Sequence, residues 1–284
     1  MFHNRPNFTY FSQSLDIKNK FALILTATIS VDNIPKAYPS DKNVREQQYM
    51  RTLRYYLCNY PDLRKIIFIE NSASSLDNLQ QLVLMNNLYQ KEIEFISLDT
   101  NLYHSQKGKG FGECLLLQEG LSKSQLIKNV THFGKVTGRI ILRNIMDIMK
   151  TIPANFDCIC DYKDQGYKVK NILFNQNKSP FCDTRFIAFS KNFYQQNLVN
   201  LHINFLANQP NSYFCIESEY FKKIKSLENQ SNIIKRFKIE PKFQGISGHT
   251  GSKKYGGKNY NSPYEKIKFH IRNFLRKILP VLHL

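Results

Sequence analysis

The sequence lacks the long apolar segments that anchor or export proteins. No apolar run approaches the roughly 20 residues needed to cross a bilayer, and residues 1–20 contain no apolar core of a signal peptide. There is no internal repeat either. We therefore expect a soluble protein made in the cytosol, in contact with a membrane only at its surface.

Zinc and disulfide patterns are missing as well. The six cysteines are scattered along the chain. Cys158 and Cys160 are only two residues apart and face the same side of a predicted strand, but Cys-x-Cys alone is not a zinc motif. We expect reduced thiols, most of them in the core, as is usual for cytosolic proteins.

Acidic residues are scarce relative to basic ones. The chain has 22 Asp and Glu against 40 Lys and Arg, which gives a formal net charge of +18. Such an excess attracts nucleic acids, anionic lipid surfaces or phosphorylated small molecules. A nucleic-acid-binding protein is therefore one hypothesis, but no known nucleic-acid-binding motif is present and the strongest basic cluster lies in an amphipathic tail. We predict that nucleic acid is not the partner.

What the chain does contain is an alternation of buried strands and helices. Apolar runs at 21–29, 65–72 and 93–98 have the composition of central strands, and helices are predicted near 43–57 and 76–88. This β-α-β-α-β order predicts an α/β fold with a mostly parallel, doubly wound sheet flanked by helices.

Polar residues follow the first two of these strands. Thr26 and Thr28 close the first run, and Glu70, Asn71 and Ser72 close the second. Ligands of doubly wound sheets bind at the carboxyl ends of the strands. We therefore expect these side chains at the edge of a binding site; for the second group, a simple turn after the strand is the alternative.

A glycine-rich segment, Gly108 to Gly112, precedes a helix predicted over about 113–127. Free N–H groups at such a turn can bind an anion, and Lys109 and Gly110 lie within it. The segment lacks the Walker A spacing, and it follows the third strand, whereas a dinucleotide-binding fingerprint follows the first. Alone, it is a weak indication of an anion site.

One strand-like run carries fixed positive charge. Within His132–Leu142, apolar residues surround Lys135, Thr137, Gly138 and Arg139. Two cations in a buried strand are costly unless they meet an anion, and the glycine allows a ligand to approach the backbone. A strand end with solvated cations is the alternative, but the nearby glycine-rich segment favours a shared anion site.

The second half of the chain supplies carboxylates. A strand predicted over 156–161 places Asp157 and Asp161 on one face. Asp183 and Arg185 open a further predicted strand, where they either pair with each other or contact a substrate.

The order of these elements over residues 20–225 resembles that of GT-A-type glycosyltransferases of bacterial capsule and lipopolysaccharide synthesis. The resemblance implies a Rossmann-like fold, a nucleotide-sugar donor, and a glycan or lipid-linked glycan acceptor in a growing surface glycan. It rests on the strand that ends at Thr26–Thr28, the helix opened by Arg45–Tyr49, the strand 66–72, the helix start at 108–113, and Lys135–Arg139.

The resemblance also implies roles for individual residues. Glu217, or else Asp183, would be the catalytic base of an inverting enzyme, although an acid that begins a helix can simply stabilise the helix dipole. Arg185 would contact the acceptor, as would His249 if its glycine-rich loop closes. The donor would contact Thr26, Thr28, Arg45, Glu70, Asn71, Ser72, Lys109, Gly110, Lys135, Thr137, Gly138 and Arg139.

One departure concerns the metal. Most GT-A enzymes hold a divalent metal on the donor diphosphate with an Asp-x-Asp motif, whose place is taken here by Thr137-Gly138-Arg139. Lys135 and Arg139 can neutralise a diphosphate leaving group without a metal. We predict no metal site and no further cofactor; Asp157 and Asp161 are the alternative ligands for Mn²⁺ or Mg²⁺. A nucleotidyltransferase, the other alternative function, would normally need paired carboxylates for magnesium.

The end of the chain forms a separate unit in this interpretation. Residues 1–245 form the catalytic domain, and residues 246–284 contain a basic glycine-rich loop and an amphipathic helix at 264–279. The helix either docks on the domain or lies on an anionic membrane, at the inner face of the cytoplasmic membrane. Its apolar face is Ile267, Ile271, Phe274, Leu275 and Ile278, flanked by Lys266, Lys268, Arg272, Arg276 and Lys277.

Overall fold

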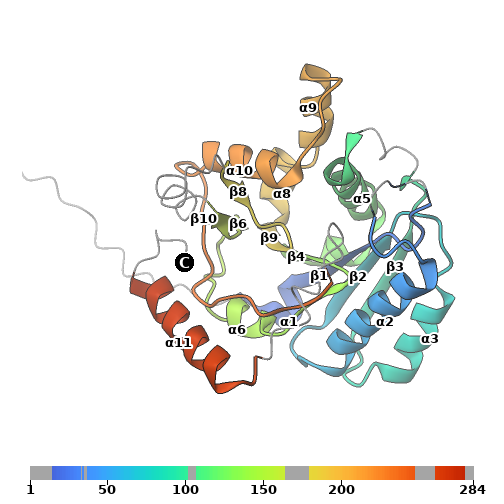
Figure 1. Cartoon of the computed structure of the whole chain (residues 1–284), viewed down its shortest axis with the longest axis horizontal. Coiled ribbons are helices and arrows are strands. Elements are labelled where there is room, and N and C mark those ends of the chain that lie inside the picture. Colours follow the sequence, from blue (N-terminus) through green and yellow to red (C-terminus); the bar gives the residue numbers. More distant parts are fainter. Residues whose placement is uncertain are drawn as a thin grey trace, which may run out of the picture.

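A computed structural model describes residues 15–32, 34, 37–101, 107–163, 179–246 and 260–278. Its largest sheet has seven strands in the order β10-β6-β9-β4-β1-β2-β3 (Figure 1). The strands are β1 (Phe21–Ala27), β2 (Lys65–Glu70), β3 (Glu92–Ser97), β4 (His132–Thr137), β6 (Cys158–Ile159), β9 (Phe186–Ser190) and β10 (Ile233–Ile234). Two small sheets pair β5 (Ile140–Leu142) with β11 (Phe243–Gly245), and β7 (Tyr162–Lys163) with β8 (Phe181–Cys182).

Strand β1 is an inner strand of this sheet, next to the central strand β4. It pairs in parallel with β2 and with β4, and all seven of its residues are buried except for a small part of Thr26. A strand covered on both faces needs apolar residues at every position, which explains the continuous apolar run in the sequence. The predicted mostly parallel sheet is confirmed.

Helices cover both faces of the sheet, and each face has its own hydrophobic core. Helices α2, α3 and α6 pack on one face, and α5, α8 and α10 pack on the other (Figure 1). The helices are α1 (Ile17–Lys20), α2 (Lys42–Cys58), α3 (Asp77–Asn86), α5 (Lys109–Lys123), α6 (Ile145–Met149), α8 (Lys191–Asn197), α9 (Leu201–Asn208), α10 (Ile216–Ser226) and α11 (Pro263–Ile278).

Three predicted boundaries are wrong. Helix α5 begins at Lys109, so the glycines that follow lie inside its first turns, and only Gly108, with a φ of 99°, has the left-handed conformation of a turn. The run 132–142 is two strands, because the chain turns at Gly138 and leaves the main sheet. Strand β9 begins at Phe186 and lies between β4 and β6, antiparallel to both.

Helix α11 docks on the domain with its polar side. Arg276 is only 5% exposed, and its Nη1 lies 3.2 Å from Oδ1 of Asp161. Arg272 Nη1 lies 2.6 Å from Oε1 of Glu240. Two of the five cations predicted to flank the apolar face therefore hold the helix in place instead. The apolar residues are turned outward, with exposed fractions between 53% and 62% for Ile267, Ile271, Phe274 and Ile278.

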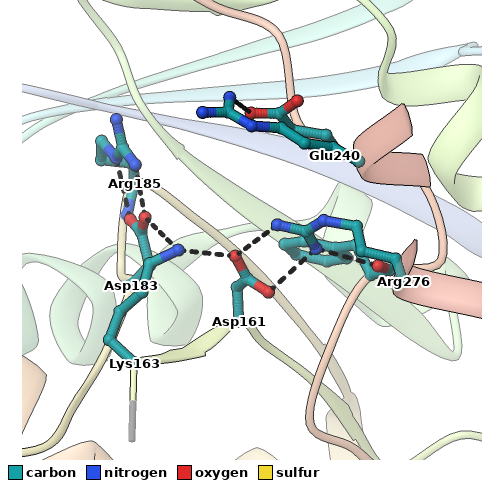
Figure 2. A network of polar contacts seen from close by, with 8 residues as sticks. Asp161, Lys163, Asp183, Arg185, Glu240 and Arg276 are labelled. Carbon is teal, nitrogen blue, oxygen red and sulfur yellow. Dashed lines mark hydrogen bonds and ion pairs between the residues drawn. The ribbon is translucent and has the colours of Figure 1, made fainter. Parts of the chain in front are cut away.

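Figure 2 shows how Asp161 connects α11 to the sheet. Asp161 contacts Arg276 and also Nζ of Lys163, at 2.8 Å, while Lys163 lies 4.0 Å from Oδ2 of Asp183. Asp183 in turn accepts a hydrogen bond of 2.9 Å from Nε of Arg185. Burial alone would raise the pKa of Asp161, but Lys163 and Arg276 lower it to about 2. We call these five side chains the Asp161 network.

Replacing Asp161 by asparagine is expected to lower the free energy of unfolding by roughly 3–5 kcal/mol, because it leaves Arg276 as an uncompensated buried charge. The wild-type protein should lose the same contribution in acid. An unfolded aspartate takes up a proton near pH 3.9, whereas folded Asp161 does so near pH 2. The stabilisation is therefore present above pH of about 4 and lost as the pH falls toward about 2.

Urea unfolding between neutral and acidic pH measures both effects. Asp62→Asn is the matched control, since Asp62 is exposed and no cation within the described residues pairs with it. Equal stability of the Asp161 variant and the control at neutral pH would contradict a stabilising network.

Candidate functional site

A pocket opens at the carboxyl ends of β1, β2 and β4, where the sequence predicts the ligand. It encloses about 170 Å³, less than the roughly 300–1,000 Å³ of sites for drug-sized ligands. The described walls thus have room for phosphate groups and part of a larger molecule. Seven of the residues predicted to bind the donor line it: Thr26, Thr28, Arg45, Asn71, Lys109, Thr137 and Arg139.

Two buried arginines form one wall of the pocket. Arg45 Nε donates to the carbonyl of Thr28 at 2.8 Å, and its other guanidinium nitrogens donate to Pro39 O and Tyr49 Oη. Arg139 Nη1 donates to the carbonyl of Tyr38 at 3.0 Å and to Oε1 of Gln48 at 2.9 Å. All these partners are neutral, and no carboxylate of the described chain lies within 4 Å of either guanidinium. Among the described residues, these two buried cations thus share a pocket with no carboxylate at ion-pair distance from either guanidinium.

The electrostatics of the pocket follow from this crowding of cations. Burial lowers the pKa of Arg45, and the nearby Arg139 lowers it further. Burial also lowers the pKa of Lys109, as do Arg45 and Arg139. An arginine stays charged even with a lowered pKa, so the pocket is strongly positive. A site of this kind stabilises an anion with several negative oxygens, such as a diphosphate.

Glu70 and Ser72 support the pocket from outside. The Glu70 carboxylate is fully buried and accepts hydrogen bonds from the backbone N–H groups of Ile29 at 3.0 Å, Ser72 at 2.9 Å and Ser74 at 3.2 Å. Burial raises the pKa of Glu70 above its usual value, although these hydrogen bonds act in the opposite direction. With its oxygens occupied, Glu70 fixes the loops after β1 and β2 and does not line the pocket. Of the predicted residues Glu70, Asn71 and Ser72, only Asn71 is in the pocket lining.

Lys135 is also turned away from the pocket. Its side chain is 1% exposed, forms an ion pair with Glu113 and donates to the carbonyl of Thr184 at 2.8 Å. Glu113, by contrast, lines the pocket. Lys135, which we predicted to contact phosphate, is therefore neutralised by Glu113 behind the pocket lining. Within the 132–142 run, Arg139 is the cation that lines the pocket.

The two glycines assigned to the donor have packing roles. A Cβ on Gly110 would come within 2.7 Å of the Ile216 backbone nitrogen, and one on Gly138 within 2.6 Å of the Thr26 carbonyl oxygen. The Gly138 N–H donates to that same carbonyl at 2.9 Å. Both glycines allow close backbone contacts, and neither lines the pocket.

Glu217 lies in the first turn of α10, next to the start of α5. Gly110 of α5 abuts the backbone of the preceding residue, Ile216. The Glu217 carboxylate is half-buried and accepts a contact of 3.4 Å from Sγ of Cys215. No cation within the described residues pairs with it. Glu217 therefore presents a carboxylate without an ion-pair partner among the described residues, beside the start of α5, but it does not line the pocket.

Asp183 has a different environment. It is buried and held by Arg185 and Lys163. Burial would raise its pKa, but the bonds from Arg185 and the charge of Lys163 lower it. A carboxylate so stabilised as an anion is a poor proton acceptor. The structure contains the predicted alternative, an Asp183–Arg185 pair.

The arrangement of Asp157 and Asp161 corrects the alternative metal site. The two residues flank β6 at its opposite ends, about 13 Å apart along an extended chain. Asp157 accepts from Asn232 N at 2.9 Å and from Ser190 Oγ, whereas Asp161 belongs to the Asp161 network. They cannot share one ion.

The position of the Asp-x-Asp motif does not fit a metal either. Arg139 stands there with its guanidinium in the pocket, and a guanidinium repels a divalent cation. Within the described ranges, no group of three or more His, Cys, Asp or Glu is arranged to hold a metal ion.

Sequence reasoning missed part of the site. Tyr49 lines the pocket, and its hydroxyl accepts from the Thr28 N–H at 2.9 Å. Glu113, Val31 and Ile34 line it too. Tyr49 lies four residues after the predicted Arg45 on the same face of α2, a signal that would have found it. His249, predicted to contact the acceptor, lies outside the described residues.

No family model and no curated protein matches the sequence. Similar solved structures include the mannosyltransferase Ktr4p from S. cerevisiae in complex with GDP, with 8% identity over 85% of this chain and 75% of that one and a TM-score of 0.48. Mouse xyloside xylosyltransferase 1 has 9% identity, coverage of 76% and 84%, and a TM-score of 0.40. A cytidylyltransferase from Leptospira borgpetersenii has 8% identity over 76% of this chain and 75% of that one, with a TM-score of 0.36. Because these TM-scores lie below 0.5, the functional argument rests on this chain's own residues.

Proposed function

We propose that the protein is a glycosyltransferase that transfers a sugar from a nucleotide-sugar donor to a growing surface glycan. The observation that carries this proposal is the pair of buried arginines, Arg45 and Arg139, at the carboxyl edge of a parallel sheet, whose hydrogen-bond partners among the described residues are all neutral. A donor diphosphate supplies the missing negative charge. It also explains why cations and small polar groups converge there beside the apolar residues of the lining.

The reaction is a single displacement in this proposal. Glu217 takes the proton of an acceptor hydroxyl as the oxygen attacks the anomeric carbon of the donor. The bond from that carbon to the diphosphate oxygen breaks, and its electron pair leaves with the nucleoside diphosphate. Arg45, Arg139 and Lys109 stabilise the developing charge. Displacement from the opposite side inverts the anomeric configuration, and no metal is part of the mechanism.

A thermal-shift screen with UDP-, GDP- and CMP-sugars tests the donor. One of these families is expected to raise the melting temperature, because a ligand that binds only the folded state stabilises it. The shift should be the same with and without EDTA, since the arginines take the place of the metal. Sugar-1-phosphates without a nucleotide are the control and should give a smaller shift.

Two outcomes would contradict this assignment. Stabilisation that disappears with EDTA and returns with Mn²⁺ or Mg²⁺ would show that a metal binds the diphosphate. Release of pyrophosphate from a nucleoside triphosphate and a sugar phosphate would make the protein a nucleotidyltransferase.

The proposed place of action is the inner face of the cytoplasmic membrane, where lipid-linked acceptors of capsule or lipopolysaccharide synthesis reside. No helix among the described residues is long and apolar enough to span a bilayer. Support comes from α11, whose apolar residues face outward with Lys266, Lys268 and Lys277 beside them. An interfacial helix has this distribution of side chains. The division of the chain at residue 246 stays a prediction.

A further inference from the structure

A second cavity lies where the start of α11 meets the catalytic domain. It has a volume of about 490 Å³ and is separate from the donor pocket, with no lining residue in common. Arg143 follows β5, Lys242 precedes β11, and Lys266 and His270 come from α11. Segments about 100 residues apart in the sequence thus place basic side chains around one space.

The cations around this cavity form no ion pairs with the part of the chain that the structure describes. Asp147 is the one carboxylate in the cavity lining that the structure describes. No ion pair involving Arg143, Lys242 or Lys266 forms among the described residues. Lys242 is held in position, because its Nζ lies 3.7 Å from the centroid of the Phe269 ring. Three cations against one acid leave a site that attracts a phosphate group.

Exposed apolar residues follow on the same helix, within one turn of the residues that line the cavity. His270 lines the cavity, and Phe274, one helical turn further along α11, is 62% exposed. Ile267 and Ile271 extend the same exposed face. A ligand that fits both parts has an anionic phosphate head and long apolar tails. Nucleic acids and free phosphate match only the charged part.

We propose that this cavity binds the headgroup of an anionic phospholipid, while α11 inserts its apolar face among the acyl chains. The inference deepens the proposed membrane location of the glycosyltransferase and rests on it. One lipid would bind through its phosphate at a defined site. This binding would add to the diffuse attraction that any basic surface has for an anionic bilayer.

Vesicle flotation of the full chain tests the site. The probes are vesicles of phosphatidylcholine alone and of phosphatidylcholine mixed with phosphatidylglycerol. The variant is Arg143→Gln with Lys266→Gln; the matched control is Lys18→Gln with Lys123→Gln, which removes the same charge from exposed positions on α1 and α5. The cavity variant is expected to lose affinity for the mixed vesicles by roughly tenfold or more relative to the control.

A second measurement separates a lipid site from a phosphate site and from diffuse attraction. Short-chain phosphatidylglycerol below its micelle concentration should bind with a stoichiometry of one to the wild type and weakly to the cavity variant. Inorganic phosphate should bind much more weakly than the lipid. Equal losses in the cavity and control variants, or equal binding of phosphate and lipid, would overturn the proposal, as would binding of RNA without binding of vesicles.

The donor pocket provides an independent readout. The cavity variant is expected to keep the thermal shift that a nucleotide sugar produces, because none of the substituted residues lines that pocket. If the wild type shows a nucleotide shift but does not bind vesicles, only the proposed lipid site is contradicted. If it binds vesicles but shows no nucleotide shift, the proposed glycosyltransferase function is contradicted instead.

Discussion

Replacing Glu217 by glutamine is expected to reduce turnover by roughly 10²–10⁴-fold, the usual contribution of a general base, while donor binding stays unchanged. Glutamine keeps the size of the side chain but cannot take up the acceptor proton. Glu217 stands at the start of α10 with no cation paired to it among the described residues. The measurements are steady-state sugar transfer and, separately, the thermal shift with the donor.

Two variants serve as controls for this experiment. Glu219→Gln removes an acid from the same turn of α10, but Glu219 pairs with Lys222 at 2.7 Å, so transfer should persist. Asp183→Asn should lower the free energy of unfolding and leave the pH dependence of transfer unchanged, because Asp183 is bound by Arg185. Full activity of the Glu217 variant, with transfer lost in the Asp183 variant, would move the base to Asp183.

Replacing Arg139 by glutamine should weaken donor binding at least tenfold. A hydrogen bond from a charged group contributes about 1.5–3 kcal/mol, and about 1.4 kcal/mol corresponds to a factor of ten. The fold should remain intact, since Arg139 is one of two neighbouring buried cations and its removal relieves the repulsion that helps to lower the pKa of Arg45. Donor titration by calorimetry measures the loss, and circular dichroism verifies the fold.

Arg64→Gln is the matched control for this titration. Arg64 also donates to a backbone carbonyl, that of Tyr89 at 2.8 Å, but it lies just before β2, at the opposite edge of the sheet from the pocket. Its variant should bind the donor like the wild type. Undiminished binding by the Arg139 variant would mean that the diphosphate does not occupy the pocket.

The central part of the fold could be predicted because local composition determines it. The runs that form β1 and β2 are apolar at nearly every position, which only a strand covered on both faces requires. The break at Gly138 could not be predicted in this way. Strand-forming apolar residues, Val136 and Ile140, stand on both sides of the Thr137–Arg139 segment, and the partner of β5 is β11, about 100 residues further along the chain.

The site residues, too, could be predicted only where local sequence determines their position. Thr26, Thr28 and Asn71 were predicted at the pocket because strand ends meet at one edge of a parallel sheet. The orientation of Lys135 depends on its ion pair with Glu113 of α5, and no local sequence pattern predicts this pair. The orientation of α11 was equally hidden, since its periodicity identifies an apolar face but cannot say whether that face is covered.

If the proposed membrane location of α11 holds, the Asp161 network would fix the distance between the donor pocket and the bilayer. The network begins at α11 and ends at Arg185, whose carbonyl accepts a hydrogen bond of 3.2 Å from the N–H of Thr137 in the donor pocket. A helix lying in the headgroup layer would therefore hold the pocket at a constant distance from the membrane plane. Acceptor hydroxyls at that distance would be glycosylated, and shorter or longer glycans would be missed, so the same contacts that dock one helix would set the length of the chain that is extended.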